Sequence, residues 1–340
     1  MHKRLVNHCT IALSLIPDGP ILIKSGKEGA DPTKPDMEFV ETYHAGGKTI
    51  YLPGSSLKGA IRAHAERIVR TVGSDQRPTD DSSQLWANDP LNDKYDYLPD
   101  NKSGKLGAEI YKLSSFTDQL FGNTSIASRI RIEDAYPDEE AQPVKKEERN
   151  GVAIDRVFGS VAVGPFNYQV CTAGEFKTKI HLKNFTLAQL GLIGLVLRDL
   201  NDGWFGIGFA KSRGLGTVQV KLDSAVVQYP SCEIRDNQIH DFGQQKRWAN
   251  NTLLGAGEFL ALEEAKRYGF LTDQNQEDRQ DTSVLAKKMQ LTFGLENNPL
   301  DIDIGVQLSW HGNDETGVPN LFQCAVQSWS KVLKVERTAA

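Results

Sequence analysis

Two glycine-containing segments carry hydroxyl and basic side chains that could hold a phosphate. The first is Pro53-Gly54-Ser55-Ser56-Leu57-Lys58. We expect it at the start of a helix, where exposed amides and the helix dipole favour an anion. Lys58 and Arg62 are four residues apart and would share one face of that helix. Ordinary serine capping of an amphipathic helix explains the same pattern equally well from sequence alone.

The second segment is Gly206–Gly216, which contains Lys211, Ser212, Arg213 and Gly214. Glycines let backbone amides approach phosphate oxygens, and Lys211 and Arg213 supply positive charge. The segment is not a Walker loop, because no glycine directly precedes its Lys-Ser pair. It is not a dinucleotide fingerprint either, because we expect a strand after it. A connection whose glycines only permit tight packing is the favoured alternative from spacing alone.

Other candidate residues are weaker when each is taken alone. Acidic side chains in the Gly- and Pro-rich loop at 24–48 could act as a general base or bind a metal ion, although solvated loop charge is the simpler explanation. Arg156 follows Asp155 in a glycine-flanked segment and could bind phosphate or stack on a base; a surface Asp–Arg pair is the commoner case. His44 and His64 show no metal-binding spacing, so no metal site is assigned.

Composition limits the class of protein. The 340 residues are 39% hydrophobic and 24% charged, which supports a sizeable core and excludes wholesale disorder. No run approaches the roughly 20 apolar residues of a membrane span, and four scattered cysteines without a CxxC pair predict reduced thiols in a cytoplasm. The net charge of −5 argues against binding nucleic acid by bulk charge. Residues 1–222 nevertheless hold 28 basic and 27 acidic residues, against 11 and 17 in 223–340.

Hydrophobic periodicity predicts an α+β fold. The expected order is strand, helix, strand, strand, helix, strand, at 8–23, 57–69, 129–135, 176–182, 186–200 and 217–222, with a β-hairpin that begins near Gly151 before the strand at 176–182. A further helix at 113–121 should stop at Gly122. This order fits a ferredoxin-like or RNA-recognition-motif (RRM)-like sheet with large insertions. Beyond residue 223 we expect a helix at 253–268 and a strand at 301–310. The apolar spacing at 322–335 fits either a helix or a strand.

Five segments, in this order, resemble the repeat-associated mysterious protein (RAMP) superfamily of CRISPR systems. They are YLPGSSLKGAIR at 51–62, DQLFGN at 118–123, SRIRIEDAY at 128–136, NGVAIDRVFGSVAVGP at 150–165 and GIGFAKSRGLGTVQV at 206–220. The resemblance implies an RRM-like palm and a β-hairpin thumb in a core at 1–222. The thumb would span about 144–175 and an insertion about 73–107. Residues 223–340 would form a C-terminal extension or docking element.

The nearest likeness is to the backbone subunit of type III effector complexes, whose thumbs kink the duplex of guide RNA (crRNA) and target RNA. It implies a cytoplasmic protein that binds crRNA, target RNA and other effector subunits, and no membrane. The residues that would contact RNA are Lys24, Ser55, Ser56, Lys58, Arg62, Arg156, Lys211, Ser212, Arg213 and Gly214.

Many such subunits also cleave the target RNA, using an aspartate in the loop after the first strand. Asp36 matches that aspartate best, with Asp31 as the alternative, and Mg²⁺ or another divalent cation is an optional cofactor. The expected chemistry is attack of a 2′-OH on the adjacent phosphate. The glycine run before the family's aspartate is degraded here, and Lys24 stands where a polar or imidazole group often follows the first strand.

Three other functions therefore stay open. The first is a non-catalytic structural subunit of the same complex. The second is a guide-processing ribonuclease, for which His44 or His64 would have to serve. The third, from a different class, is a ferredoxin-like small-molecule enzyme with a phosphate-binding glycine loop.

Overall fold

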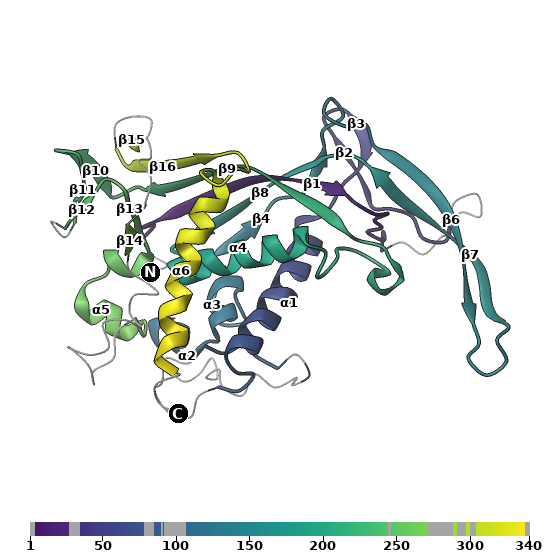
Figure 1. Ribbon diagram of the computed structural model, residues 1–340, viewed down its shortest axis with the longest axis horizontal. Coiled ribbons are helices and arrows are strands. Elements are labelled where there is room, and N and C mark those ends of the chain that lie inside the picture. The colour runs from purple at the N-terminus through teal and green to yellow at the C-terminus, as the bar shows by residue number, and fades with distance from the viewer. Residues whose placement is uncertain are drawn as a thin grey trace.

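The computed structural model describes residues 4–26, 35–77, 85–89, 91, 107–243, 246–270, 288–290, 297–299 and 304–336. Its centre is a seven-stranded antiparallel sheet with the order β15-β16-β9-β1-β8-β4, in which β5 also pairs with β8 (Figure 1). The strands are β1 (His8–Pro17), β4 (Ile130–Ile132), β5 (Tyr136–Pro137), β8 (Phe176–Lys183), β9 (Val218–Tyr229), β15 (Asn297–Pro299) and β16 (Val306–His311).

The four inner strands and two helices have the ferredoxin-like arrangement. Helix α1 (Gly54–Val72) connects β1 to β4, and helix α4 (Leu187–Asn201) connects β8 to β9. The chain order is therefore strand, helix, strand, strand, helix, strand, and the spatial order is β9-β1-β8-β4. The expected fold class is confirmed. A capping box at Thr186 and Gln189 begins α4, because each residue's side chain bonds the other's backbone amide.

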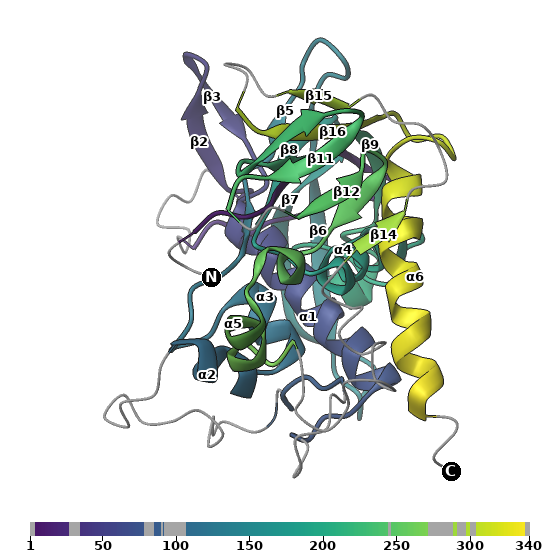
Figure 2. The ribbon, with the colours of Figure 1, turned by 90° about the vertical axis from the view of Figure 1, so that its left-hand side faces the viewer.

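Alternation along the strands gives the sheet one covered and one open face. In β8, Ile180 and Leu182 are buried, whereas Lys177, Lys179 and Lys183 are exposed. Helices α1, α3, α4 and α6 all lie on the same side of the sheet (Figures 1 and 2). The lysine-bearing face of β8 is therefore the face without a helical layer.

Two hairpins extend from this palm. Where the thumb is expected, β6 (Lys145–Ile154) and β7 (Val161–Ala173) form a long hairpin that projects well beyond the sheet (Figure 1). A shorter hairpin of β2 (Glu41–His44) and β3 (Gly47–Ile50) follows the loop that contains Asp36.

The last third of the chain completes the palm. The expected boundary at residue 222 falls inside β9, which continues to Tyr229 and pairs with β16. Helix α6 (Val318–Glu336) packs against α4, and the Trp329 indole donates a hydrogen bond to the carbonyl oxygen of Ala188 at 2.9 Å. In the chain between β9 and β15, two smaller sheets form: one from β10 (Cys232–Arg235), β11 (Gln238–Asp241) and β12 (Arg247–Ala249), and one from β13 (Thr252–Leu254) and β14 (Lys288–Gln290).

Two predicted helices differ in the structure. The helix predicted at 113–121 is divided into α2 (Gly107–Leu113) and α3 (Phe116–Phe121), because the Ser115 hydroxyl caps α3 by accepting the Asp118 amide at 3.1 Å. It does end at Gly122. The helix predicted at 253–268 is wrong over its first half.

That first half contains β13 and the 3-10 turn η2 (Ala256–Phe259), and only α5 (Leu262–Arg267) is α-helical. The physical reason is pairing with distant segments. Leu253 and Leu254 pair with β14, and the Leu254 amide donates to the hydroxyl of Tyr229, which is fully buried in β9. Of the expected 73–107 insertion, residues 73–77, 85–89, 91 and 107 are described, and Leu85, Trp86 and Ala87 are buried.

We expect Gly194→Ala to destabilise the protein by about 1–3 kcal/mol. A Cβ at Gly194 would lie 2.6 Å from the Cβ of Phe322, so α6 would have to move away from α4. Chemical denaturation measures the change in the free energy of unfolding.

Gly59→Ala in α1 is the matched control, because a Cβ there meets nothing within 4 Å. It should leave stability unchanged or raise it by up to about 1 kcal/mol through helix propensity. Equal effects of the two substitutions would contradict close α4–α6 packing as the reason for Gly194.

Candidate nucleic-acid interface

Helix α1 begins directly against the end of β4. A Cβ on Gly54 would lie 2.3 Å from the carbonyl oxygen of Ile132, so only glycine permits this approach. The Gly54 amide donates to Asp134 Oδ1 at 2.7 Å, which places one carboxylate at the positive end of the helix. The N-cap residue is Pro53, whose own side chain makes no capping hydrogen bond, so the Asp134 carboxylate takes that place. Ser55 and Ser56 are therefore exposed hydroxyls of the first turn and not caps.

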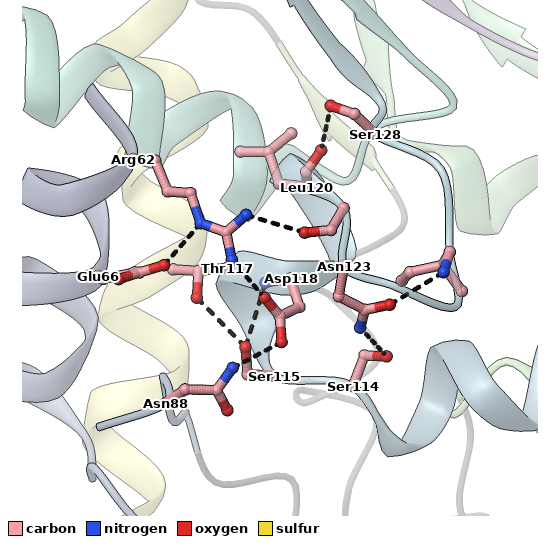
Figure 3. A network of polar contacts seen from close by, with 12 residues as sticks. Arg62, Glu66, Asn88, Ser114, Ser115, Thr117, Asp118, Leu120, Asn123 and Ser128 are labelled. Carbon is pink, nitrogen blue, oxygen red and sulfur yellow. Dashed lines mark hydrogen bonds and ion pairs between the residues drawn. The ribbon is translucent and has the colours of Figure 1, made fainter. Parts of the chain in front are cut away.

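Lys58 and Arg62 lie on the same face of α1 and are both bonded to the protein. Lys58 Nζ donates to Ser128 Oγ at 2.8 Å, and burial together with the nearby Arg62 lowers the pKa of Lys58. Arg62 donates from Nε to Glu66, from Nη1 to the Gly122 carbonyl and from Nη2 to the buried Asp118 (Figure 3). Since its guanidinium already holds α1 against α3, we do not propose that Arg62 contacts RNA.

The glycine loop is folded tightly onto the segment that follows β1. A Cβ at Gly208 would lie 2.3 Å from the Leu22 carbonyl oxygen, and one at Gly216 would lie 2.3 Å from the Ile207 carbonyl oxygen. Both glycines also have positive φ angles, of 78° and 96°. The packing explanation therefore holds for these two positions. Packing does not explain Gly214, because a Cβ there would meet nothing within 4 Å.

The apex of the same loop is presented to solvent. Lys211–Arg213 form a 3-10 turn (η1), and all three side chains are exposed, as is Gly214. The loop therefore has a packed base that fixes its position and a cationic apex that is available to a ligand.

His64 links α1 to α4 and to the residue before this loop. His64 Nε2 lies 2.8 Å from Asp199 Oδ2 on α4, and both residues are buried. The His64 ring also stacks on Phe205 at 4.2 Å between ring centroids. His64 therefore has a structural position between α1, α4 and the start of the loop.

Sequence inspection did not single out Trp204, which lies two residues before the loop. Its side chain is 69% exposed, and the Arg198 guanidinium lies 5.9 Å from its ring centroid. An exposed tryptophan beside cations is the kind of surface on which bases stack. Its position between Gly203 and the cationic motif could have identified it.

Asp36 lies beside the thumb. Its Oδ2 accepts the amide of Asn167 in β7 at 2.9 Å, and the neighbouring Met37 forms a bridge with Tyr168. The Asp36 side chain is exposed. Lys24 is also exposed and forms a backbone bridge with Phe39, so the two ends of this loop run side by side. Asp31 lies outside the described residues.

Arg156 lies at the far end of the thumb. The Asp155 carboxylate accepts the amides of Val157 at 2.7 Å and Phe158 at 2.8 Å, so it closes the turn between β6 and β7. Arg156 itself is exposed, and Val157 and Phe158 beside it are 80% and 84% exposed. The thumb therefore ends in one cation and a group of apolar side chains.

The structure thus gathers most of these candidates at one end of the palm. The Phe209 amide in the glycine loop donates to the Leu22 carbonyl at 2.7 Å, and the Val40 amide donates to the Ile23 carbonyl at 2.9 Å. These bonds connect the loop, the Asp36 segment and the end of β1. The thumb and the β2–β3 hairpin extend from the same end (Figure 1).

Within the described residues, no three His, Cys, Asp or Glu side chains gather closely enough to hold a metal ion. No helix in the described part of the chain is long and apolar enough to span a bilayer.

A comparison with protein-family models matches the RAMP superfamily over residues 17–219, from the end of β1 into β9. The chain belongs to the RAMP superfamily. The RAMP assignment confirms the resemblance and makes the chain a CRISPR-associated RNA-binding subunit. RAMP proteins bind CRISPR RNA in multi-subunit complexes. A search of the curated proteins finds no match.

We expect Asp118→Ala to destabilise this RAMP protein by roughly 3 kcal/mol, because it removes a fully buried carboxylate that Arg62 and Asn88 both bond. The free energy of unfolding from denaturant titration measures the loss. Glu263→Ala is the control: Glu263 is 81% exposed and should contribute less than about 0.5 kcal/mol. A loss no larger than that of the control would contradict the organising role of the Arg62 network.

Proposed function

We propose that this chain is a backbone subunit of a type III CRISPR interference complex that binds crRNA and cleaves the paired target RNA. The observation that supports it most is the cationic apex of the glycine loop, held beside the Asp36 segment on a RAMP palm. The protein's net charge is −5, so RNA must be held by local contacts of this kind.

In this proposal the guide backbone lies along the exposed groups at that end of the palm. Lys211 and Arg213 bind phosphates, Ser212 and the Gly214 amide donate hydrogen bonds, and Trp204 offers a ring for a base. The exposed Ser55 and Ser56 hydroxyls, Lys58 and Lys24 extend the contact. Arg156 and the apolar thumb tip meet the guide–target duplex at a distance from this surface.

Cleavage uses the target's own 2′-OH. Asp36 accepts the proton of the 2′-OH as that oxygen attacks the adjacent phosphorus, and the 5′-oxygen of the next nucleotide leaves and takes a proton from solvent. The products are a 2′,3′-cyclic phosphate and a 5′-OH. The Asp36 carboxylate accepts a hydrogen bond from the thumb strand β7. A shift of the thumb would therefore also move the catalytic base. A divalent cation would bind Asp36 together with phosphate oxygens, since Mg²⁺ commonly uses one or two carboxylates and substrate phosphates.

One observation favours the non-catalytic alternative. Asp36 Oδ2 is already bonded to a backbone amide, and the described residues gather no group of three His, Cys, Asp or Glu side chains that would make a metal site at Asp36. A structural subunit of the same complex would bind guide RNA through the same surface and leave the target intact. The small-molecule enzyme would instead co-purify with a nucleotide and without RNA.

We expect the double substitution Lys211→Ala and Arg213→Ala to weaken binding of single-stranded RNA at least tenfold at low salt. It should reduce the slope of log K against log salt by about 1.4, because two phosphate contacts are lost. Fluorescence anisotropy with labelled RNA at several salt concentrations measures both quantities. Trp204 adds a local probe, since the other four tryptophans are buried.

RNA bound at the loop should quench the emission of Trp204 and protect it from acrylamide. The matched control is Arg235→Ala with Arg247→Ala, which removes two exposed cations from the β10–β12 sheet. Equal losses in the two double variants would show that only overall charge matters and would contradict the assigned surface.

We expect Asp36→Asn to abolish target cleavage while guide binding stays within about twofold, because asparagine keeps an acceptor for the Asn167 amide but cannot take a proton. The assembled complex with guide and labelled target RNA gives the readout on a denaturing gel. Asp31→Asn is tested in parallel. Undiminished cleavage by both variants would exclude this catalytic loop, and absence of cleavage by the unsubstituted complex would favour the structural subunit.

A further inference from the structure

The open face of the palm carries a groove that the proposed RNA surface does not use. It has a volume of about 660 Å³ and lies over Ala12 of β1 and Lys177 and Lys179 of β8. One wall is the segment Arg131–Asp134. The small Ala12 side chain keeps the floor low, since Ala12 pairs directly with Lys179 across the two strands. None of the lining residues belongs to the glycine loop or to helix α1.

A column of aromatic rings ends at this groove. His44, on the β2–β3 hairpin, stacks on Tyr136 at 3.7 Å between ring centroids with planes 10° apart. Tyr136 in turn lies 5.8 Å from Tyr51 at an interplanar angle of 16°. His44 is exposed and ends the column, so its outer ring face can accept another flat group. Nucleic-acid bases are the flat groups that such exposed rings most often bind in RNA-binding folds.

The charges around the groove fit a nucleotide. The Lys179 side chain is exposed, and its ammonium group makes no hydrogen bond or ion pair within the described part of the chain, whereas Lys177 is paired with Asp138. Lys179 is therefore the cation with an available ammonium group. Glu133, Asp134 and Asp223 line the same groove and could accept hydrogen bonds from ribose hydroxyls. A mixed lining of this kind suits a whole nucleotide better than a bare phosphate.

Further basic side chains continue along the same face. Lys183 lies on the same side of β8 as Lys179, and Arg131 and His181, which both contact Glu133, lie across from each other on β4 and β8. Burial and the neighbouring His181 and Arg131 lower the pKa of His8 on β1, as expected for a locally positive surface. A longer chain of phosphates would gain contacts here that a free nucleotide would not.

We propose that the groove holds one unstacked nucleotide of a single-stranded RNA, with the base on the His44 ring and a phosphate on Lys179. This inference rests on the proposed RNA-binding function and adds a second, separate contact on the opposite face of the sheet from the helices. The β2–β3 hairpin positions His44 over the face, so the contact depends on a hairpin and a strand that are distant in sequence.

The test is a titration of the full chain with single-stranded RNA that carries 2-aminopurine and a terminal fluorescein. Aminopurine emission falls when the base stacks on a ring, and fluorescein anisotropy reports total binding. We expect His44→Ala to remove most of the aminopurine quenching and to weaken binding at least about fivefold. Lys179→Ala should lower the salt slope by about 0.7.

Tyr43→Ala is the matched control, because Tyr43 precedes His44 on the same strand, is 81% exposed and does not line the groove. It should change neither signal. His44 is exposed, so its removal should leave the thermal unfolding temperature within a few degrees of the unsubstituted protein's value.

The outcomes separate this inference from the proposed function. Loss of RNA binding in the glycine-loop double variant, with His44→Ala and Tyr43→Ala both silent, would overturn the groove and keep the function. Absence of RNA binding by the unsubstituted chain would overturn both. A free mononucleotide that binds as tightly as RNA, and in a His44-dependent way, would overturn the assignment to an RNA strand.

Discussion

The arrangement of the whole interface depends on the close approach of two backbones, those of the glycine loop and the segment after β1. The Phe209 amide bonds the Leu22 carbonyl at 2.7 Å, and the Gly216 amide bonds the Pro20 carbonyl at 2.9 Å. A side chain at Gly208 would collide with the Leu22 carbonyl. If the two backbones separated, the cations at the loop apex would lose their fixed position relative to the Asp36 segment.

Positive charge in this protein has two uses. Arg62 and Arg129 bond other groups of the protein. Arg62 holds α1 against α3. Arg129, which is 2% exposed, lies over the ring of Tyr111 and donates to its hydroxyl. Lys211, Arg213 and Lys179 are instead presented to solvent. A chain of net charge −5 can bind RNA only if this second group is concentrated in a few places, and the palm concentrates it at one end and on one face.

The C-terminal third stabilises the sheet that carries these groups. β16 covers the free edge of β9, which would otherwise expose unpaired backbone amides and carbonyls. Helix α6 lies so close to α4 that Gly191 and Gly194 are needed at the contact. Removal of this C-terminal third would expose both the edge of β9 and the apolar face of α4.

Several features follow from the sequence by itself, because they depend on neighbours close in the chain. Alternation predicts β8 and β9, apolar spacing at Leu57, Ile61 and Val69 predicts α1, and Thr186 marks the start of α4. The five ordered motifs identify the superfamily, and the loops at 53–58 and 206–216 mark its candidate surface.

Tertiary structure alone decided that Arg62 faces Asp118, that Leu253 and Leu254 form a strand and not a helix, and that the last third belongs to the palm. It also brought His44, Tyr136 and Lys179 to one groove. Local patterns encode which face of an element is apolar, whereas the partner on that face is set by pairing between segments that are distant in sequence.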